Sequence, residues 1–285
     1  MCKVLFNGAD ESDLDGEFAL RPYSFFENSE WTDSLVRDVC SSTLLVAGVA
    51  REGWFNESAR VNVFCKRAGY DMSHLYQARP VPDAWDVARS RSWLDTCLRC
   101  HNGCNDRRST AVPGMCLIDC KDLIIVEVDQ TSQWVALSYV WGADMPAATT
   151  IEGETRFRPG SRICTKVAAT VRDAITVTKQ LGYRFLWVDE YCIDQGSDSH
   201  LDAQINRMDQ IYQGAVLTIV AAVGDDKKHG LPGLGSTKRC QRPLIRIGDY
   251  LMFSNGPSPE REARKSKWFS RGWYIFRSSF SSRIH

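Results

Sequence analysis

The clearest pattern in the chain is an alternation of short apolar runs and amphipathic stretches in its second half. Three apolar runs have the length and the β-branched and aromatic content of buried strands: residues 134–139, 185–188 and 216–223. Between them, apolar residues recur at helical spacing in 167–182 and 199–214. Strand, helix, strand, helix, strand is typical of a parallel sheet with right-handed crossovers. The pattern predicts an α/β fold with flanking helices and leaves the strand order open.

The second amphipathic stretch indicates where its helix begins and what it buries. Ser199 is predicted as the N-cap, and Asp202 as the acid of a capping box. Four apolar side chains are predicted to form the buried face, which is more typical of core packing than of cofactor contacts: Ile205, Met208, Ile211 and Tyr212. Residues 230–235 lack a phosphate-loop lysine and are predicted to form a turn.

The first part of the chain is predicted to be an N-terminal extension of mixed secondary structure. Residues 1–33 are polar with scattered aromatics and are expected to form a loosely ordered lead-in. Strands are predicted at 44–49 and, more weakly, at 61–65. Apolar residues at helical spacing predict a helix over 85–98. A hairpin is predicted from two further segments: residues 112–119 and 123–128.

Composition narrows the class of protein. The 285 residues are enough for one large or two modest domains, and 44% are hydrophobic, which is enough for a core. Acidic and basic residues number 35 each, so we expect neither a nucleic-acid partner nor a membrane surface as partner. The 11 cysteines are an odd number and no export signal precedes them, which predicts mostly reduced thiols in a cytosolic or nuclear protein, and we expect a cytoplasmic location.

A cluster of cysteines and a histidine is a candidate metal site. Four soft ligands fall within eight residues: Cys97, Cys100, His101 and Cys104. Zinc accepts such ligands, but structural sites usually draw two pairs from separate turns. Cys116 and Cys120 are the candidates for a second pair. Packed thiols beside a helix-end histidine explain the same pattern, so both interpretations stay open.

The apolar run at 185–188 ends abruptly in acidic and amide side chains. Asp189 and Glu190 follow it directly, and Asp194 and Gln195 lie on a predicted loop before Gly196. Open α/β sheets place ligand sites at the carboxyl ends of their strands, which favours a functional site here. The alternative is that these acids only fix the loop and cap the next helix. In an extended strand, Asp189 and Glu190 are expected to point to opposite faces.

Three core segments resemble the successive motifs of the fungal heterokaryon incompatibility (HET) domain. They read ALSYVWG at 136–142, LWVDEYCIDQ at 186–195 and QINRMDQIYQGAVLTIVAAVG at 204–224. SRGWYIFRSSFSSR at 270–283 is similar to the last motif, and WLDTCLRCHNGC at 93–104 and CLIDC at 116–120 are similar to segments that precede the domain. The resemblance divides the chain into three parts: an N-terminal extension at 1–90, a Cys/His-containing lead-in at 91–130, and a HET domain at 131–285, expected to be truncated at its C-terminus.

The resemblance implies a fungal module of non-self recognition that signals growth arrest or cell death in the cytoplasm. Its partners would be other incompatibility proteins or a second copy of itself. It also implies a distant relationship to flavodoxin-like TIR domains, some of which cleave NAD with one glutamate. NAD is therefore an expected ligand or substrate, and a carboxylate beside the ribose can stabilise an oxocarbenium-like centre. A zinc-stabilised interaction domain is a weaker alternative.

The last motif departs from the family pattern at three positions. Arg271, Gly272 and Trp273 match, but the family's Thr, Gln and Glu are replaced by other residues: Tyr274, Phe276 and Arg277. Arginine reverses the charge of the expected acid and cannot stabilise a cation. An NAD-cleaving enzyme would then need Asp189, the family-matched position, or Glu190 as its acid.

The residues that would line a ligand cleft come from strand ends and the terminal segment. Ser138, Tyr139, Trp141 and Gly142 follow the first strand, Asp189, Asp194 and Gln195 follow the second, and Trp273 and Arg277 come from the last motif. Each has a structural alternative, because Trp141 and Trp273 are also typical core aromatics and Asp194 a typical loop acceptor.

Overall fold

The computed structural model describes the backbone of strands at 17–23, 43–51, 54–55 and 61–67. It further describes residues 80–100, 112–129, 131–143, 159–163, 167–241, 244–254 and 259–270. The chain divides into two units. One unit draws on residues 1–83 and 240–258, and the other on residues 84–239 and 259–285.

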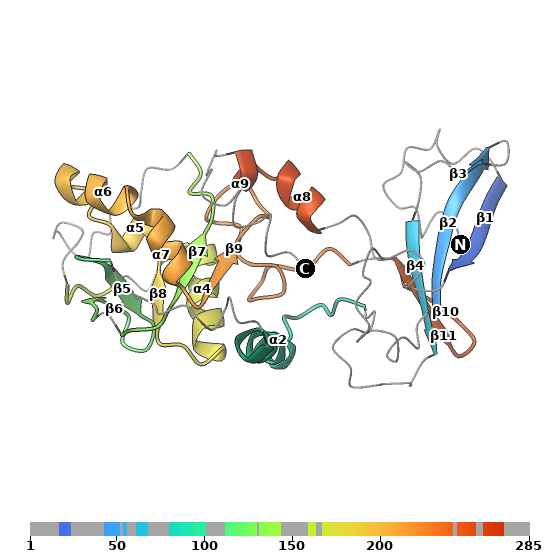
Figure 1. Ribbon diagram of the computed structural model, residues 1–285, viewed down its shortest axis with the longest axis horizontal. Coiled ribbons are helices and arrows are strands. Elements are labelled where there is room, and N and C mark those ends of the chain that lie inside the picture. Colours follow the sequence, from blue (N-terminus) through green and yellow to red (C-terminus); the bar gives the residue numbers. More distant parts are fainter. Residues whose placement is uncertain are drawn as a thin grey trace. The chain divides into compact units, whose positions relative to one another are not determined.

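The second unit contains a five-stranded sheet in the order β6-β5-β8-β7-β9 (Figure 1). Its strands are β5 (Cys116–Asp119), β6 (Ile124–Glu127), β7 (Trp134–Ser138), β8 (Phe185–Trp187) and β9 (Leu217–Val220). β7 is parallel to both β8 and β9, whereas β5 is antiparallel to β6 and to β8. The α/β class is confirmed, but the sheet is mixed and not wholly parallel. β5 and β6 form the predicted antiparallel hairpin, because a short turn reverses the chain between them. This hairpin extends the three parallel strands on the side of β8.

Helices flank this sheet. They are α2 (Val87–Cys100), α4 (Ala169–Gln180), α5 (Asp189–Cys192), α6 (Asp198–Ile205), α7 (Met208–Gly214), α8 (Pro259–Lys265) and α9 (Lys267–Ser270). The predicted stripe of α4 is confirmed, since Val171, Ala174 and Val177 are buried. No residue of α2 is buried, and Arg91 ties this helix to the end of α4 by donating to the Gln180 carbonyl oxygen.

The region predicted as one helix from Ser199 to Gly214 is two helices. Ser197, not Ser199, is the N-cap of α6, and its hydroxyl accepts a hydrogen bond from the His200 amide at 3.4 Å. The predicted capping box with Asp202 is therefore wrong, since His200 occupies the third helical position. The α-helical hydrogen bonding is interrupted at Asn206 and Arg207, where the Arg207 amide donates to the Gln204 carbonyl oxygen in a tighter turn.

This break changes which side chains the two helices bury. Met208, Ile211 and Tyr212 are buried on α7, as predicted, but Ile205 at the end of α6 is 46% exposed. Trp187 of β8 packs edge-to-face on Tyr212, with ring centroids 5.2 Å apart. Trp134 of β7 donates its indole N–H to the Ile211 carbonyl oxygen at 3.2 Å. The two tryptophans thus fix α7 on the parallel strands.

The first unit is an antiparallel sheet in the order β1-β2-β4-β11-β10, with β3 paired to β2. Its strands are β1 (Glu17–Tyr23), β2 (Thr43–Arg51), β3 (Trp54–Phe55), β4 (Val61–Arg67), β10 (Leu244–Ile247) and β11 (Tyr250–Ser254). The predicted strands at 44–49 and 61–65 are confirmed, whereas β1 contradicts a loosely ordered lead-in at 17–23. Strand pairing with β2 over seven residues orders this segment despite its polar flanks.

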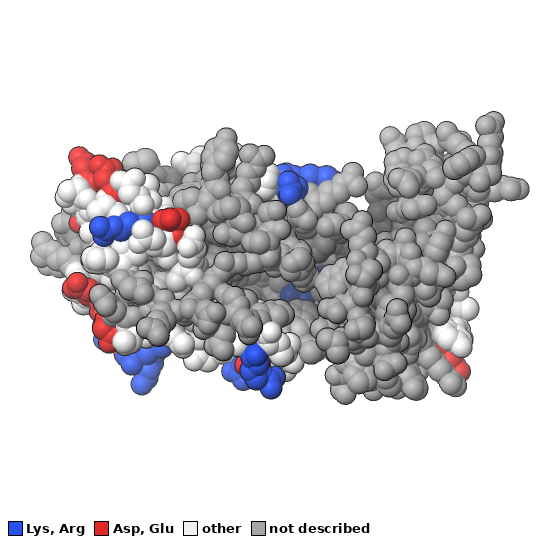
Figure 2. Space-filling model, viewed as in Figure 1, with Lys and Arg blue, Asp and Glu red and all other residues white. Residues whose placement is uncertain are grey.

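Surface charge on the visible described face is of both signs. In Figure 2, acidic and basic side chains are interspersed over the described part of the α/β unit. Within the described residues, no helix combines the length and the apolar character needed to cross a membrane.

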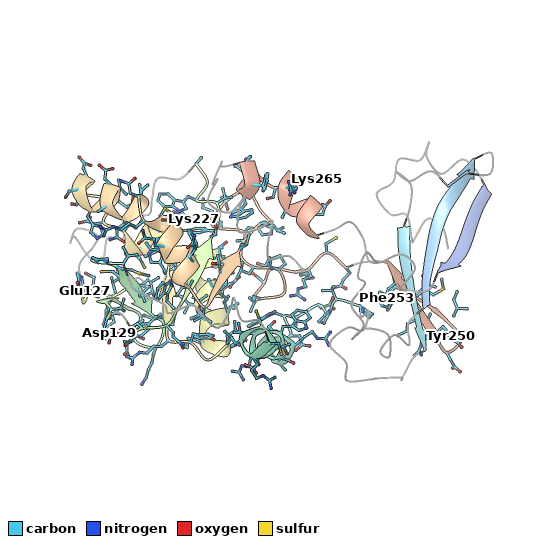
Figure 3. All side chains as sticks on the ribbon, viewed as in Figure 1. Glu127, Asp129, Lys227, Tyr250, Phe253 and Lys265 are labelled. Carbon is cyan, nitrogen blue, oxygen red and sulfur yellow. The ribbon has the colours of Figure 1, made fainter. Side chains whose placement is uncertain are left out.

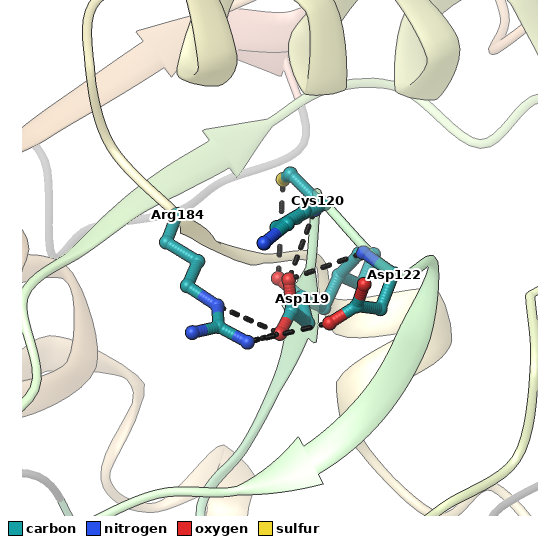
Figure 4. A network of polar contacts seen from close by, with 6 residues as sticks. Asp119, Cys120, Asp122 and Arg184 are labelled. Carbon is teal, nitrogen blue, oxygen red and sulfur yellow. Dashed lines mark hydrogen bonds and ion pairs between the residues drawn. The ribbon is translucent and has the colours of Figure 1, made fainter.

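A buried carboxylate fixes the turn of the β5–β6 hairpin (Figure 4). Asp119 is 1% exposed, and its Oδ2 accepts hydrogen bonds from Arg184 Nε at 2.8 Å and Nη2 at 2.6 Å. Its Oδ1 accepts from the amides of Lys121 and Asp122. Burial raises the pKa of Asp119, but these four hydrogen bonds outweigh it and hold the pKa below its usual range. The ionised carboxylate therefore ties the turn to the residue preceding β8.

We predict that Asp119→Asn flattens the acid dependence of stability. The folded pKa of Asp119 is depressed, so its contribution is present above the unfolded pKa of about 3.9 and is lost as the pH falls toward the folded pKa. Denaturant unfolding between about pH 3 and pH 6 should show the native chain losing stability on acidification more steeply than the variant. Asp122→Asn is the matched control, because Asp122 has a side chain 50% exposed. Equal slopes for the native chain and Asp119→Asn would contradict the prediction.

Candidate functional site

The parallel strands bring their carboxyl ends to one edge of the sheet. β7 ends at Ser138 and leads into Tyr139 and Trp141, while β8 ends at Trp187 and leads into α5. The predicted residues Ser138, Tyr139, Trp141, Asp189 and Glu190 are therefore brought together in space. A role of these strand ends in binding or catalysis stays a prediction.

A buried ion pair with a tyrosine is the centre of this edge. Glu190 Oε1 lies 2.6 Å from Lys227 Nζ, and Glu190 Oε2 accepts a hydrogen bond from the Tyr139 hydroxyl at 2.7 Å. Glu190 and Lys227 are each 5% exposed, and Tyr139 is 4% exposed. Burial, followed by the charges of Asp189 and Glu190, raises the pKa of Tyr139 well above its usual value. Tyr139 is therefore a protonated donor to a carboxylate engaged on both oxygens.

Lys227 was not predicted from the sequence, although it completes this network. It lies in the segment after β9 and is labelled in Figure 3. Its own carbonyl oxygen accepts a hydrogen bond from the Thr170 amide, in the first turn of α4, at 3.1 Å. A charged residue in a loop carries no periodic signal, and lysine is almost never fully buried unless it is paired. The burial of Lys227 is explained only by the position of Glu190 in the folded chain.

Asp189 makes a separate set of contacts beside this pair. Its Oδ1 accepts hydrogen bonds from Trp141 Nε1 at 3.0 Å and from the Glu190 amide at 2.8 Å. Asp189 and Trp141 are both half-buried. Asp189 begins α5 and is not the end of an extended strand, so the expectation of opposite faces in a strand was wrong. Successive residues of a helix turn by about 100°, which lets Asp189 and Glu190 take different partners along one edge.

Gly142 belongs to the same edge for a steric reason. Its φ of +90° lies in the left-handed region that favours glycine. A Cβ at this position would lie 2.6 Å from the Cβ of Asp226, which precedes Lys227. Gly142 thus allows the chain after β7 to approach the segment that holds Lys227.

Asp194 and Gln195 make contacts within their own loop. Asp194 Oδ1 accepts from the Gly196 amide at 2.9 Å, and the Asp194 amide donates to His200 Nδ1 at 3.2 Å. Gln195 Nε2 lies 3.3 Å from the carbonyl oxygens of Asp189 and of Ile193 and donates to both. These contacts agree with the alternative interpretation, in which the two residues fix the loop between α5 and α6. A role in ligand binding stays a prediction.

The hydroxyl of Ser138 accepts a hydrogen bond from a residue of the C-terminal helices. Trp268 of α9 donates its indole N–H to Ser138 Oγ at 2.8 Å, and both side chains are buried. Trp268 was not predicted from the sequence, because a single aromatic residue in a short helix has no distinctive spacing. The predicted Trp273 and Arg277 lie outside the described residues.

Part of the candidate zinc site can be placed. Cys97 and Cys100 lie in the last turn of α2, whereas His101 and Cys104 lie outside the described residues. Cys116 and Cys120 are buried in and after β5, and burial raises their pKa values to about 11 and about 12. Burial of these two thiols disfavours the thiolate, which is the form that binds metal. Among the described side chains, no group of three or more His, Cys, Asp or Glu residues has the arrangement of a metal site.

The comparison with protein families identifies the segment that carries this edge. The model of the heterokaryon incompatibility protein (HET) family matches residues 134–276, which is half of the chain. The chain belongs to the HET family. The HET match begins at the first residue of β7 and includes all of the contacts described around Glu190, Asp189 and Ser138. No match was found among curated proteins or among solved structures, so the TIR-like part of the resemblance stays a prediction.

We predict that the Glu190–Lys227 pair of this HET domain shows strong coupling. Lys227→Met leaves a buried carboxylate without its cation and should lower the free energy of unfolding by about 3–5 kcal/mol. The double variant Glu190→Leu with Lys227→Met should cost clearly less than the sum of the two single changes, because no unpaired charge remains. Denaturant unfolding of the four proteins measures this difference.

The exposed pair of Glu262 and Lys265 on α8 is the control for this cycle. Their side chains are 47% and 62% exposed, and Lys265→Met should change stability by no more than about 0.5 kcal/mol. Additive losses at Glu190 and Lys227 would show that the two charges are not coupled in solution.

Proposed function

We propose that this chain is an incompatibility module that signals growth arrest or cell death when genetically different hyphae fuse. Membership of the HET family indicates a function related to heterokaryon incompatibility. The observation that carries the proposal is that the matched segment includes the whole cluster at the carboxyl ends of the parallel strands. Other incompatibility proteins or a second copy of the chain are the proposed partners.

The contacts divide this cluster into a supporting part and a part that can meet a partner or ligand. Glu190, Lys227 and Tyr139 are buried and hold one another, so they support the edge from inside. Asp189 and Trp141 are half-buried and lie at the end of β8 and after β7, where open α/β sheets bind ligands. Asp189 is therefore the residue at which signalling should be most sensitive.

We predict that Asp189→Asn reduces cell-death signalling with little loss of stability. Asparagine keeps an oxygen that can accept from Trp141 Nε1 and the Glu190 amide, but it removes the negative charge. Growth arrest after induced expression in a fungal host, scored beside the unfolding midpoint of the purified protein, measures both effects. Asp198→Asn in the first turn of α6 is the control, since this exposed acid lies outside the cluster. Unchanged signalling by Asp189→Asn would refute a functional role for its charge.

Cleavage of NAD is a second candidate function, and the position of Asp189 is the observation that favours it. Both oxygens of Glu190 are engaged by Lys227 and Tyr139, which leaves Asp189 as the better placed of the two acids. In this reaction water adds to the ribose carbon as its bond to the nicotinamide nitrogen breaks. A half-buried carboxylate beside that carbon would stabilise the positive charge that develops on the ribose.

We predict that the native chain turns over NAD slowly or not at all and that Arg277→Glu increases turnover. The variant restores the acid that the family carries in its last motif. Release of nicotinamide by the purified full chain, measured at high protein concentration, compares the two, with Arg277→Gln as the control for loss of positive charge alone. Faster turnover by the native chain than by Arg277→Glu would overturn this interpretation of Arg277, and Asp189→Asn would then identify the acid.

A further inference from the structure

The antiparallel sheet of the first unit is assembled from two separate pieces of chain. Residues 17–67 supply β1, β2, β3 and β4, which pair among themselves. Residues 244–254 supply the hairpin of β10 and β11, which pair with each other. Among the described strands, the pairing of β4 with β11 alone joins the two pieces. We call this pairing of Val63–Arg67 with Tyr250–Ser254 the seam.

The hairpin needs a strand at its seam. β10 and β11 have four and five residues, and an isolated two-stranded hairpin is at best marginally stable in water. Met252 and Phe253 are 6% and 5% exposed and, as neighbours in a strand, point to opposite faces. β11 is thus buried on both faces, and it is an inner strand because it pairs with β10 on one edge and with β4 on the other.

The outer strand of the hairpin differs from β11 in its exposure. Leu244 and Ile247 of β10 are 51% and 49% exposed, so the free edge of the sheet buries little apolar surface. Figure 3 labels Tyr250 and Phe253 on the inner strand. The apolar burial that holds the hairpin is therefore concentrated at the strand that faces β4.

We propose that the seam is an exchangeable joint, at which β4 of a second copy of the chain, still paired to its own β2, replaces the chain's own β4 beside β11. A second copy offers the same five-residue register, so an exchanged pair keeps every pairing along the seam. Exchange of an identical element is a low-cost route to dimers, and its extent rises with concentration by mass action. The exchange is a property of this sheet and stands or fails independently of the signalling role.

The register provides a direct test. Cys65 of β4 faces Met252 of β11, so Met252→Cys places two cysteines at directly opposed positions. Residues so opposed have Cα atoms about 4.5–5.5 Å apart, which falls within the range of disulfides. The full chain carrying Met252→Cys is mixed in equal amounts with the same protein labelled with ¹⁵N, incubated at several concentrations and mildly oxidised. Mass spectrometry then identifies the peptide bridged between positions 65 and 252.

Exchange predicts a bridged peptide with one labelled and one unlabelled half. Its share should rise with protein concentration toward about half of all bridged peptide. Bridged peptide without any mixed label would overturn the proposal, because β4 would then pair only within its own chain. Absence of a bridge between 65 and 252 would also overturn it, because the seam would not hold the stated register.

Three further proteins keep this test decisive. Leu251→Cys faces Lys66 and should form no bridge along the seam, and Met252→Cys with Cys65→Ser should lose the bridge. The double variant Tyr250→Cys with Arg67→Cys places two cysteines directly opposite each other at one end of the seam. Tyr250 is 52% exposed, so this pair retains the test if a change at the buried Met252 prevents folding.

Discussion

The edge of the α/β unit depends on one buried ion pair. Removing Glu190 and Lys227 from water carries a desolvation cost that their attraction alone does not reliably offset. The hydroxyl of Tyr139 supplies a further hydrogen bond to the carboxylate, and together the three groups satisfy both oxygens of Glu190. These residues come from the end of β7, from α5 and from the segment after β9. The pair therefore fixes three strand ends relative to one another, which apolar packing alone specifies less narrowly.

Other contacts at this edge follow from the position of that pair. Gly142 lets the chain after β7 pass close to Asp226. The Lys227 carbonyl oxygen accepts a hydrogen bond from the Thr170 amide in the first turn of α4. Trp141 and Asp189 then form the half-buried rim, while Trp268 fills the position beside Ser138 from α9. A rigid interior beneath a more accessible carboxylate is the arrangement expected where a scaffold positions a functional group. The two adjacent acids therefore differ in accessibility: Glu190 is buried between Lys227 and Tyr139, whereas Asp189 lies at the half-buried rim.

Local patterns predicted the elements of the core well, and their limits are physical. β7, β8 and α4 are confirmed because their apolar residues are buried, which leaves a direct signal in the sequence. The direction of β5 left no such signal, since an apolar run reads the same whether a buried strand is parallel or antiparallel. The break between α6 and α7 contains neither glycine nor proline, and Ser197 and Ser199 are equally good caps in composition. Lys227 and Trp268 needed the folded chain, because each acquires its role from a residue far away in sequence.

The β10–β11 hairpin shows that family membership and structural units need not share boundaries. The HET match runs through residues 244–254, yet these strands complete a sheet whose other strands come from residues 17–67. A hairpin of nine strand residues is at best marginally stable alone, and β4 supplies the strand that pairs with the inner edge of β11. The family-matched segment therefore depends on residues outside it for part of its own fold. A strand requirement of this kind links the N-terminal part of the chain to the HET segment through backbone pairing, whichever copy of the chain supplies β4.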